Sequence, residues 1–241
     1  MHALQSVLPA PPSGPAQAIV PDAMVYVGCS GFPVPATRYL KEFLVTEVAD
    51  THLGVPGPAL VRRWRREAPP GFVFTALCPR ELTAEGFAPN AAAEAAWQAF
   101  VPVARDLEAR ALVVLSPSDL PHSKALRAQL KSFFERLRTP HLAPLVWEPP
   151  VSWDIKEAEA LVKDLGVLVA RDPFRHPASL RTDRVYYRLT GQAGFKSRYE
   201  DLALESVAKA VAGTKAEEVI AILANVDMYA DAKRLRRLLD R

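Results

Sequence analysis

Short apolar runs and segments of helical periodicity alternate along the chain from Met24 onward. Each run is rich in Val, Leu, Ile or aromatic residues and is followed by turn residues. We predict eight strands, at 24–28, 43–48, 72–77, 111–115, 144–148, 166–170, 185–189 and 218–223. Between them we predict helices at 36–42, 57–67, 90–109, 123–137, 154–164, 199–212 and 229–240. Only a short helix or a loop fits between Asp172 and Asp183.

This alternation predicts an α/β fold with a parallel sheet. Several of the runs are almost continuously apolar, as in strands buried on both faces, and helical crossovers impose parallel pairing. Eight strand–helix units favour a parallel (β/α)8 TIM-type barrel with an abbreviated connection between strands six and seven. An open doubly wound sheet is the alternative. Such a sheet usually has a glycine-rich phosphate loop after the first strand, and Gly28-Cys29-Ser30-Gly31 lacks that spacing.

The first part of the chain differs from the rest in composition. Residues 1–23 contain prolines at positions 9, 11, 12, 15 and 21, and each proline removes a backbone donor and fixes φ. We therefore predict a flexible proline-rich tail over 1–23. No composition shift marks a later linker, so we predict a single barrel domain over 24–241.

Charge and composition exclude few functions. Lys and Arg number 30 against 27 Asp and Glu, a net charge of +3 that is too small to require nucleic acid. No apolar run reaches the ~20 residues of a membrane-spanning helix. Cys29 and Cys78 form no Cys-x-x-Cys pair and follow strands that strand two should separate, so we expect two free thiols. A cytoplasmic protein with no cofactor is the default expectation.

Candidate chemistry lies at the carboxyl ends of the strands, because the loops of a parallel barrel converge there. Arg188 is the first candidate, since a guanidinium can bind a carboxylate or phosphate through two parallel hydrogen bonds. The strand Val185–Leu189 alternates its faces, which places Tyr186 and Arg188 together inside the barrel. The other predicted ligand-binding residues are Ser30, Arg80 and Asn225.

Three carboxylates could act as general acids or bases: Glu148, Asp172 and Asp227. They could equally be structural partners that neutralise Arg188. A metal site is not predicted, because the five histidines form no ligand-like cluster and only His52 lies near the strand ends. Cys29 has no assignable base and is interpreted as a buried thiol.

The motifs at the strand ends resemble the YecE-like family, a domain of unknown function (number 72). The resemblance covers residues 24–241, and it implies a β/α barrel similar to the xylose-isomerase-like barrels. The motifs, in order, are Gly28-Cys29-Ser30-Gly31-Phe32, Arg63-Trp64, Pro69-Pro70-Gly71-Phe72-Val73-Phe74, Pro79-Arg80-Glu81-Leu82-Thr83, Ser152-Trp153, Asp172-Pro173, Tyr187-Arg188-Leu189 with Gly191, and Asn225 with Asp227.

The chain also departs from that family at several polar positions. Leu77 stands where the family usually has lysine, Val114 replaces a glutamine, and Thr190 replaces a histidine. The run before Ser152-Trp153 is Trp147-Glu148-Pro149-Pro150 instead of glutamate-aromatic-arginine-histidine. These losses put the usual ligand of the family in doubt for this chain.

Three functions are compatible with the sequence. The first is binding or processing of an anionic small molecule, a class that includes phosphate-containing ones, at the strand ends. The second is a non-catalytic scaffold that binds a protein partner of unknown identity. The third is a nucleic-acid-binding barrel that uses the basic runs 62–66 and 233–237. In helices, arginines in such runs are more often solvated while Val61 and Trp64 pack inward.

Overall fold

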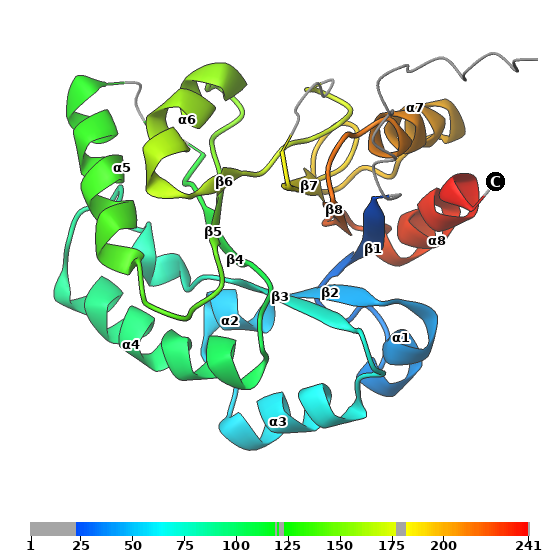
Figure 1. The fold of residues 1–241 in the computed structure, drawn as a ribbon, viewed down its shortest axis with the longest axis horizontal. Helices are drawn as coiled ribbons and strands as arrows, with labels where there is room; N and C mark the ends of the chain where they lie inside the picture. Colours follow the sequence, from blue (N-terminus) through cyan, green and yellow to red (C-terminus); the bar gives the residue numbers. More distant parts are fainter. Residues whose placement is uncertain (1–22, 119, 121–122, 177–181, 241) are drawn as a thin grey trace, which may run out of the picture.

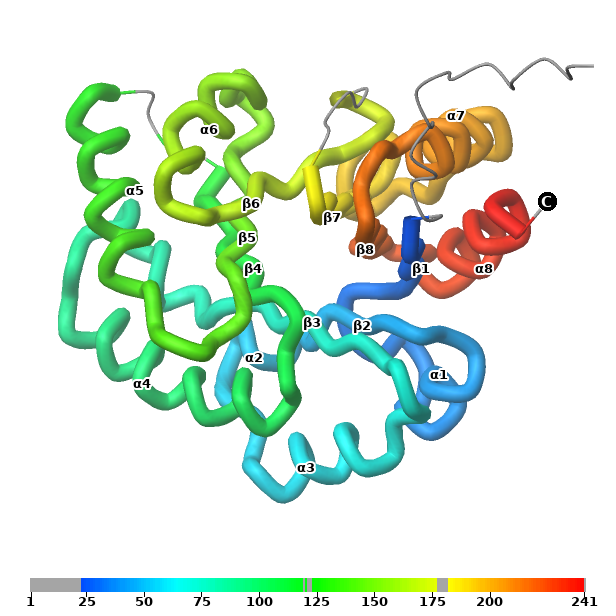
Figure 2. The backbone as a smooth tube through the Cα atoms, viewed as in Figure 1, coloured from blue at the N-terminus to red at the C-terminus, as the bar shows by residue number. Residues whose placement is uncertain are grey.

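The computed structural model describes residues 23–118, 120, 123–176 and 182–240. Eight parallel strands form one sheet at the centre, and helices surround it (Figures 1 and 2). The strands are β1 (Met24–Ser30), β2 (Val45–Val48), β3 (Val73–Leu77), β4 (Leu112–Leu115), β5 (Leu145–Glu148), β6 (Leu168–Val169), β7 (Arg184–Leu189) and β8 (Glu218–Leu223). All eight predicted strands are present, and the predicted barrel is confirmed.

The sheet runs in the order β6-β5-β4-β3-β2-β1-β8-β7. The two edge strands meet through Arg171, which lies just beyond β6. The Arg171 N–H donates to Tyr186 O at 3.0 Å, and the Arg188 N–H donates to Arg171 O at 2.9 Å. This order contains no reversal, so the doubly wound alternative is excluded. The barrel is nearly closed, and the closure depends on one residue of the β6–β7 segment.

The helices of the described residues follow the predicted alternation. They are α1 (Ala36–Glu42), α2 (Asp50–Leu53), α3 (Pro58–Glu67), α4 (Ala91–Asp106), α5 (Lys124–Leu137), α6 (Ile155–Val162), α7 (Asp201–Ala212) and α8 (Met228–Leu239), with 3-10 turns η1 (Arg80–Leu82) and η2 (Lys163–Leu165). The short α2 and η1 were not predicted. Between β6 and β7, the described residues form no helix, as the abbreviated connection predicts (Figure 1).

Local sequence explains where three of the longer helices begin. Asn90 accepts a hydrogen bond from Ala93 N, and Ser123 accepts one from Leu126 N. Asp154 accepts from the backbone of Lys156 and Glu157 at the start of α6. Each side chain satisfies a backbone donor that the first helical turn leaves open. These caps fix the ends of the βα loops that precede α4, α5 and α6.

The apolar side chains divide between two cores. An inner cluster fills the barrel and includes Val45, Tyr186 and Ile220, while a larger outer cluster lies between the sheet and the helices. Cys29 and Cys78 belong to the outer cluster and are free, which confirms the thiol prediction. Burial raises the pKa of the Cys29 thiol to about 12, so this thiol stays protonated at neutral pH.

The predicted N-terminal tail is almost entirely outside the described part of the chain. Residues 1–22 of the predicted tail lie outside the described residues, and Ala23 is half-buried against the outer cluster. The domain boundary at Met24 stays a prediction. No helix built from the described residues is both long and apolar enough to cross a membrane.

A buried tyrosine joins β1 to β2 from the helical side. The Tyr39 hydroxyl donates to Val45 O at 2.8 Å and accepts from Cys29 N at 2.7 Å. The strands come so close that a Cβ on Gly28 would lie 2.1 Å from Val45 O. Only glycine allows this approach, and the hydroxyl of Tyr39 completes the hydrogen bonding around it.

We expect Tyr39→Phe to lower the free energy of unfolding by about 1–3 kcal/mol, because two buried backbone groups lose their partner. Tyr26→Phe is the matched control, since among the described residues the Tyr26 hydroxyl makes a single exposed contact, with Met24. Its effect should stay within about 0.5 kcal/mol. Urea denaturation measures both, and equal effects of the two substitutions would contradict the role given to Tyr39.

Candidate functional site

The strand ends place polar side chains inside the barrel because each strand alternates its faces. In β7, Tyr186 lies in the inner cluster, and Arg188 follows it on the same face. In β2, Val45 belongs to the inner cluster, and Glu47 follows it two residues later. The same alternation brings Glu148 inward from β5. The apolar barrel interior therefore ends in a polar layer at the carboxyl ends of the strands.

Glu47 is the centre of this layer and is fully buried. Ser30 Oγ donates to Glu47 Oε1 at 2.6 Å, and the Tyr186 hydroxyl donates to Oε2 at 2.8 Å. Arg188 Nε lies 3.1 Å from Oε1 and 3.2 Å from Oε2. Two strands, β1 and β7, thus contribute three donors to one carboxylate, which compensates for its removal from water.

Arg188 joins Glu47 to a second carboxylate. Its Nη1 donates to Glu148 Oε2 at 2.6 Å, and its side chain is 10% exposed. Burial by itself lowers the pKa of Arg188, but the charges of Glu148 and Glu47 outweigh burial and raise this pKa overall. Arg188 therefore lies inside the mouth, as the alternation of β7 predicts. Of its predicted carboxylate partners, Glu148 forms an ion pair with it.

A hollow of about 40 Å³ lies beside Arg188. This is space for about three ordered waters or for one small charged group. Its ionisable residues are three arginines, two carboxylates and a histidine. The lining consists of Glu148, Pro149, Pro150, Val151, Trp153, Ile155, Ala170, Arg171, Asp172, Arg175, His176, Arg188 and Thr190.

Asp172 is the buried acid of the hollow, with 8% of its surface exposed. Its Oδ1 accepts from Phe174 N at 2.9 Å. Its Oδ2 lies 3.4 Å from Arg175 Nε, but makes no hydrogen bond with any described residue. Burial raises the pKa of Asp172, and the nearby charge of Glu148 adds to the effect, against the Phe174 N–H and the Arg175 charge.

His176 lies on the same turn as Asp172. Its Nδ1 accepts a hydrogen bond from Asp172 N at 3.4 Å. Burial lowers the pKa of His176, and the charges of Arg171 and Arg175 lower it further. The imidazole is therefore neutral at physiological pH, and its second ring nitrogen is a neutral polar group of the hollow.

The structure places the other predicted residues apart from the hollow. Ser30 lies in the Glu47 network, whereas Arg80 is on η1, 62% exposed and 3.6 Å from Glu81. Asn225 is buried and donates to Ser197 O and to Asp231 Oδ2, both at 2.9 Å. Asp227 is exposed at the start of α8, on a separate groove of about 650 Å³.

Glu47 and Arg175 are among the residues of the site that were not predicted as ligand-binding or acid–base residues. Glu47 could have been found from β2, because Val45 and Glu47 share a face in the same way as Tyr186 and Arg188. Arg175 had no such signal, since it lies in an irregular loop whose direction no periodicity gives. Its position depends on the turn in which Arg175 N and His176 N both donate to Asp172 O.

The basic runs are largely occupied by ion pairs with neighbouring carboxylates. In α3, Arg62 contacts Asp106, and Arg63 contacts Glu67. In α8, Lys233 lies 2.9 Å from Glu42. These pairs reduce the number of cations that could contact phosphates, and nucleic-acid binding stays a prediction.

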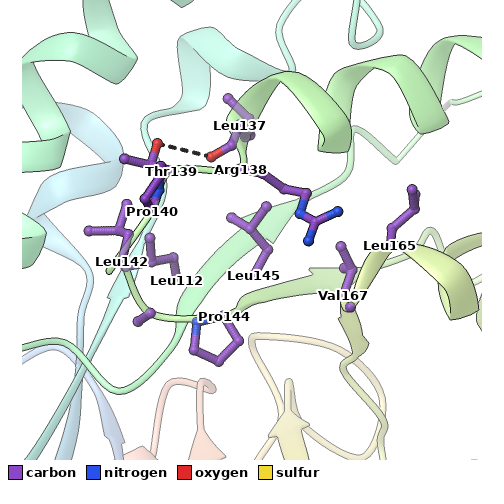
Figure 3. Close-up of a pocket in the computed structure, with 12 residues that line it drawn as sticks. Leu112, Leu137, Arg138, Thr139, Pro140, Leu142, Pro144, Leu145, Leu165 and Val167 are labelled. Carbon is purple, nitrogen blue, oxygen red and sulfur yellow. Dashed lines mark hydrogen bonds between the residues drawn. The ribbon is translucent and has the colours of Figure 1, made fainter.

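A groove of about 340 Å³ lies at the opposite rim of the barrel. Figure 3 shows that Arg138 extends between Leu145 and Leu165, beside the loop that contains Pro140. This groove precedes β4, β5 and β6. Because chemistry in parallel barrels gathers at the carboxyl ends of the strands, the hollow at Arg188 is the stronger candidate.

A metal centre has little support among the described residues. No group of three or more His, Cys, Asp or Glu side chains in that part of the chain could hold a metal ion. His52, the histidine near the strand ends, places its Nδ1 2.9 Å from Cys78 O. The candidate site is therefore described by its arginines and carboxylates.

Comparisons with known proteins give a consistent fold. The model of the family described as "Protein of unknown function DUF72" matches residues 36–241. A DUF72 family protein of Enterococcus faecalis has a TM-score of 0.75 at 19% identity, covering 91% of this chain and 98% of its own. One of Thermotoga maritima has a TM-score of 0.71 at 20% identity, covering 90% and 100%.

A more distant similarity extends to other barrels. Endonuclease IV of Thermus thermophilus has a TM-score of 0.54 at 13% identity, covering 90% of this chain and 97% of its own. No curated protein matches this chain. At these identities the structural likeness supports the barrel fold alone.

We expect Glu47→Gln to lower the free energy of unfolding by about 3 kcal/mol, because it leaves Arg188 buried with half of its charge compensation. Glu67→Gln is the control, since the Arg63–Glu67 pair is exposed on α3. Its effect should be below about 1 kcal/mol. Chemical denaturation measures both values, and a cost for Glu47→Gln as small as that of the control would contradict a central role for Glu47.

The raised pKa of Asp172 predicts a pH dependence. The folded protein holds this proton more tightly than the unfolded chain, so the contribution of Asp172 to stability is fully present below the ordinary pKa of 3.8. This contribution is lost as pH rises through the higher folded-state pKa. The stability of the wild type relative to Asp172→Asn should therefore fall as pH rises above the ordinary pKa of 3.8. Urea denaturation measures it, and a constant or rising difference would refute the expectation.

Proposed function

We propose, for a chain that belongs to the DUF72 family of proteins of unknown function, that the mouth of the barrel binds the anionic group of a small molecule. The group enters the hollow beside Arg188. The observation that carries the proposal is the guanidinium of Arg188, which is held in place but has one nitrogen without a hydrogen bond to the described residues. Arg188 is held by Glu47 and Glu148 through Nε and Nη1, while its Nη2 makes no hydrogen bond with any described residue.

A second guanidinium supports the same assignment. Arg175 lines the hollow, and its one ion pair among the described residues joins Nε to Asp172 at 3.4 Å. Its two terminal nitrogens are thus open to a ligand. Thr190 adds a hydroxyl to the lining. Two guanidinium edges and a hydroxyl are suited to the oxygens of a carboxylate or phosphate.

Asp172 gives the site a group that can exchange a proton with the ligand. Its Oδ2 is buried without a hydrogen bond to the described residues, and its raised pKa favours the protonated form compared with an ordinary aspartate. A protonated carboxyl donates a hydrogen bond to an anion, whereas an ionised one accepts from a ligand hydroxyl. We assign Asp172 this role ahead of Glu148, which Arg188 holds by an ion pair.

The alternative is a scaffold with a degenerate pocket, and one observation favours it. Glu47 and Glu148 together carry more negative charge than Arg188 can neutralise. An arginine whose charge is already balanced by two carboxylates attracts an anion less than an arginine without such partners does. The two functions differ at Arg175, because a scaffold does not require its open guanidinium edge.

Titration calorimetry with inorganic phosphate at low ionic strength tests the proposal. We expect saturable binding to the wild type and a loss of about ten-fold or more in Arg175→Gln, since hydrogen bonds to charged groups contribute about 1.5–3 kcal/mol. Arg188→Met should abolish binding, but it also leaves the buried Glu47 and the half-buried Glu148 without their cation and lowers stability strongly. Arg175→Gln is therefore the decisive variant, because the Arg175 side chain is 30% exposed.

Arg62→Gln is the matched control, because it removes an exposed arginine on α3. This helix lies on the outside of the barrel, and Arg62 does not line the hollow. Its phosphate affinity should equal that of the wild type. Two results would count against the proposal: no saturable phosphate binding to the wild type, or equal affinities in Arg175→Gln and Arg62→Gln. Either result would favour the scaffold.

A further inference from the structure

Exposed phenylalanines occur only at the mouth. The chain has ten phenylalanines, all within the described residues, and just two of them, Phe174 and Phe195, are among the exposed large hydrophobic residues. Phe174 is 40% exposed in the β6–β7 loop, and Phe195 is 59% exposed in the β7–α7 loop. Single exposed apolar residues are common on protein surfaces. Two phenylalanines on neighbouring loops around one candidate site form a pattern that needs an explanation.

Phe174 is fixed against the hollow by its own turn. Its backbone N–H donates to Asp172 Oδ1 at 2.9 Å, and the next residue, Arg175, lines the hollow. Its ring meets the ring of Tyr199 edge to face, with centroids 6.4 Å apart. Tyr199 is fully buried, and its hydroxyl accepts from Gly191 N at 3.1 Å. A buried tyrosine therefore supports a partly exposed aromatic ring two residues from Asp172.

The charges around this ring restrict what can cover it. Arg175 follows Phe174 directly, and the exposed Lys196 follows Phe195. An occupant of this part of the rim meets an aromatic face and cations at the same time. A planar aromatic ring that carries an anionic group satisfies both, because the ring stacks on phenylalanine while the anion contacts the guanidinium groups.

We infer that the anion bound in the hollow carries a planar aromatic ring, which stacks on Phe174 at the rim. This inference rests on the proposed function, because it concerns the remainder of the same ligand. The ligand class is then an aryl or nucleoside phosphate, or an aromatic carboxylate. The small volume of the hollow agrees with this division, since about 40 Å³ admits the charged group and leaves the ring outside.

Calorimetric titrations with phenyl phosphate, cyclohexyl phosphate and inorganic phosphate test the inference. The first two probes have the same charge and nearly the same size, but only phenyl phosphate has a planar aromatic ring. We expect the wild type to bind phenyl phosphate about ten-fold more tightly than cyclohexyl phosphate, as for a base on an aromatic side chain. Phe174→Leu should remove this preference and leave the affinity for inorganic phosphate within about two-fold of the wild type.

Phe195→Leu is the matched control and should keep the preference for phenyl phosphate. Equal binding of the two ring probes by the wild type, with phosphate still bound through Arg175, overturns the inference and leaves the proposed function intact. Loss of the preference in Phe195→Leu but not in Phe174→Leu overturns the assignment of the ring to Phe174. If no probe binds the wild type, the proposed function fails, and the inference fails with it.

Discussion

The buried ion cluster around Glu47 constrains how the barrel closes. A carboxylate without solvent contact is unfavourable unless donors surround it. The donors of Glu47 are Ser30 of β1 and both Tyr186 and Arg188 of β7. Tyr186 in turn bonds to Thr75 of β3 at 3.0 Å, and Arg188 reaches Glu148 of β5. Five strands therefore have to keep their register for one carboxylate to be satisfied. A register shift of one residue in β2 would turn Glu47 toward the helices.

The same cluster explains why the candidate site lies near the weakest seam of the sheet. β6 has only two residues and pairs with β5, and its link to β7 goes through the backbone of Arg171. After Arg171 the chain leaves the sheet, and it forms the turn of Asp172, Arg175 and His176. Arg188 holds the β7 side of the seam through its carboxylates. The hollow thus has one wall fixed by the ion cluster and one wall formed by an irregular loop.

Sequence periodicity predicted the elements whose side chains repeat with a fixed direction. The strands and longer helices follow from apolar spacing, and the inward position of Arg188 follows from the alternation of β7. The β6 strand was predicted over 166–170, but Gly166, which ends η2 with φ of 66°, occupies its expected start. The direction of the Arg80 side chain could not be predicted from the sequence, because the unpredicted turn η1 points this side chain to solvent. Asn225 was predicted to bind a ligand, but its side-chain amide instead donates to Ser197 and Asp231 of the protein.

The structure shows on which side of the sheet two of the departures from the family pattern lie, those at Leu77 and Val114. Leu77 belongs to the inner cluster, so the position of the family's usual lysine is filled here by an apolar side chain within the barrel. Val114 packs in the outer cluster, on the helical side of β4, and its exchange removes nothing from the mouth. Of the replacements at Leu77 and Val114, the one at Leu77 is therefore relevant to the site. Leu77 adds no cation inside the barrel, and among the described residues Arg188 is the cation that pairs with Glu47.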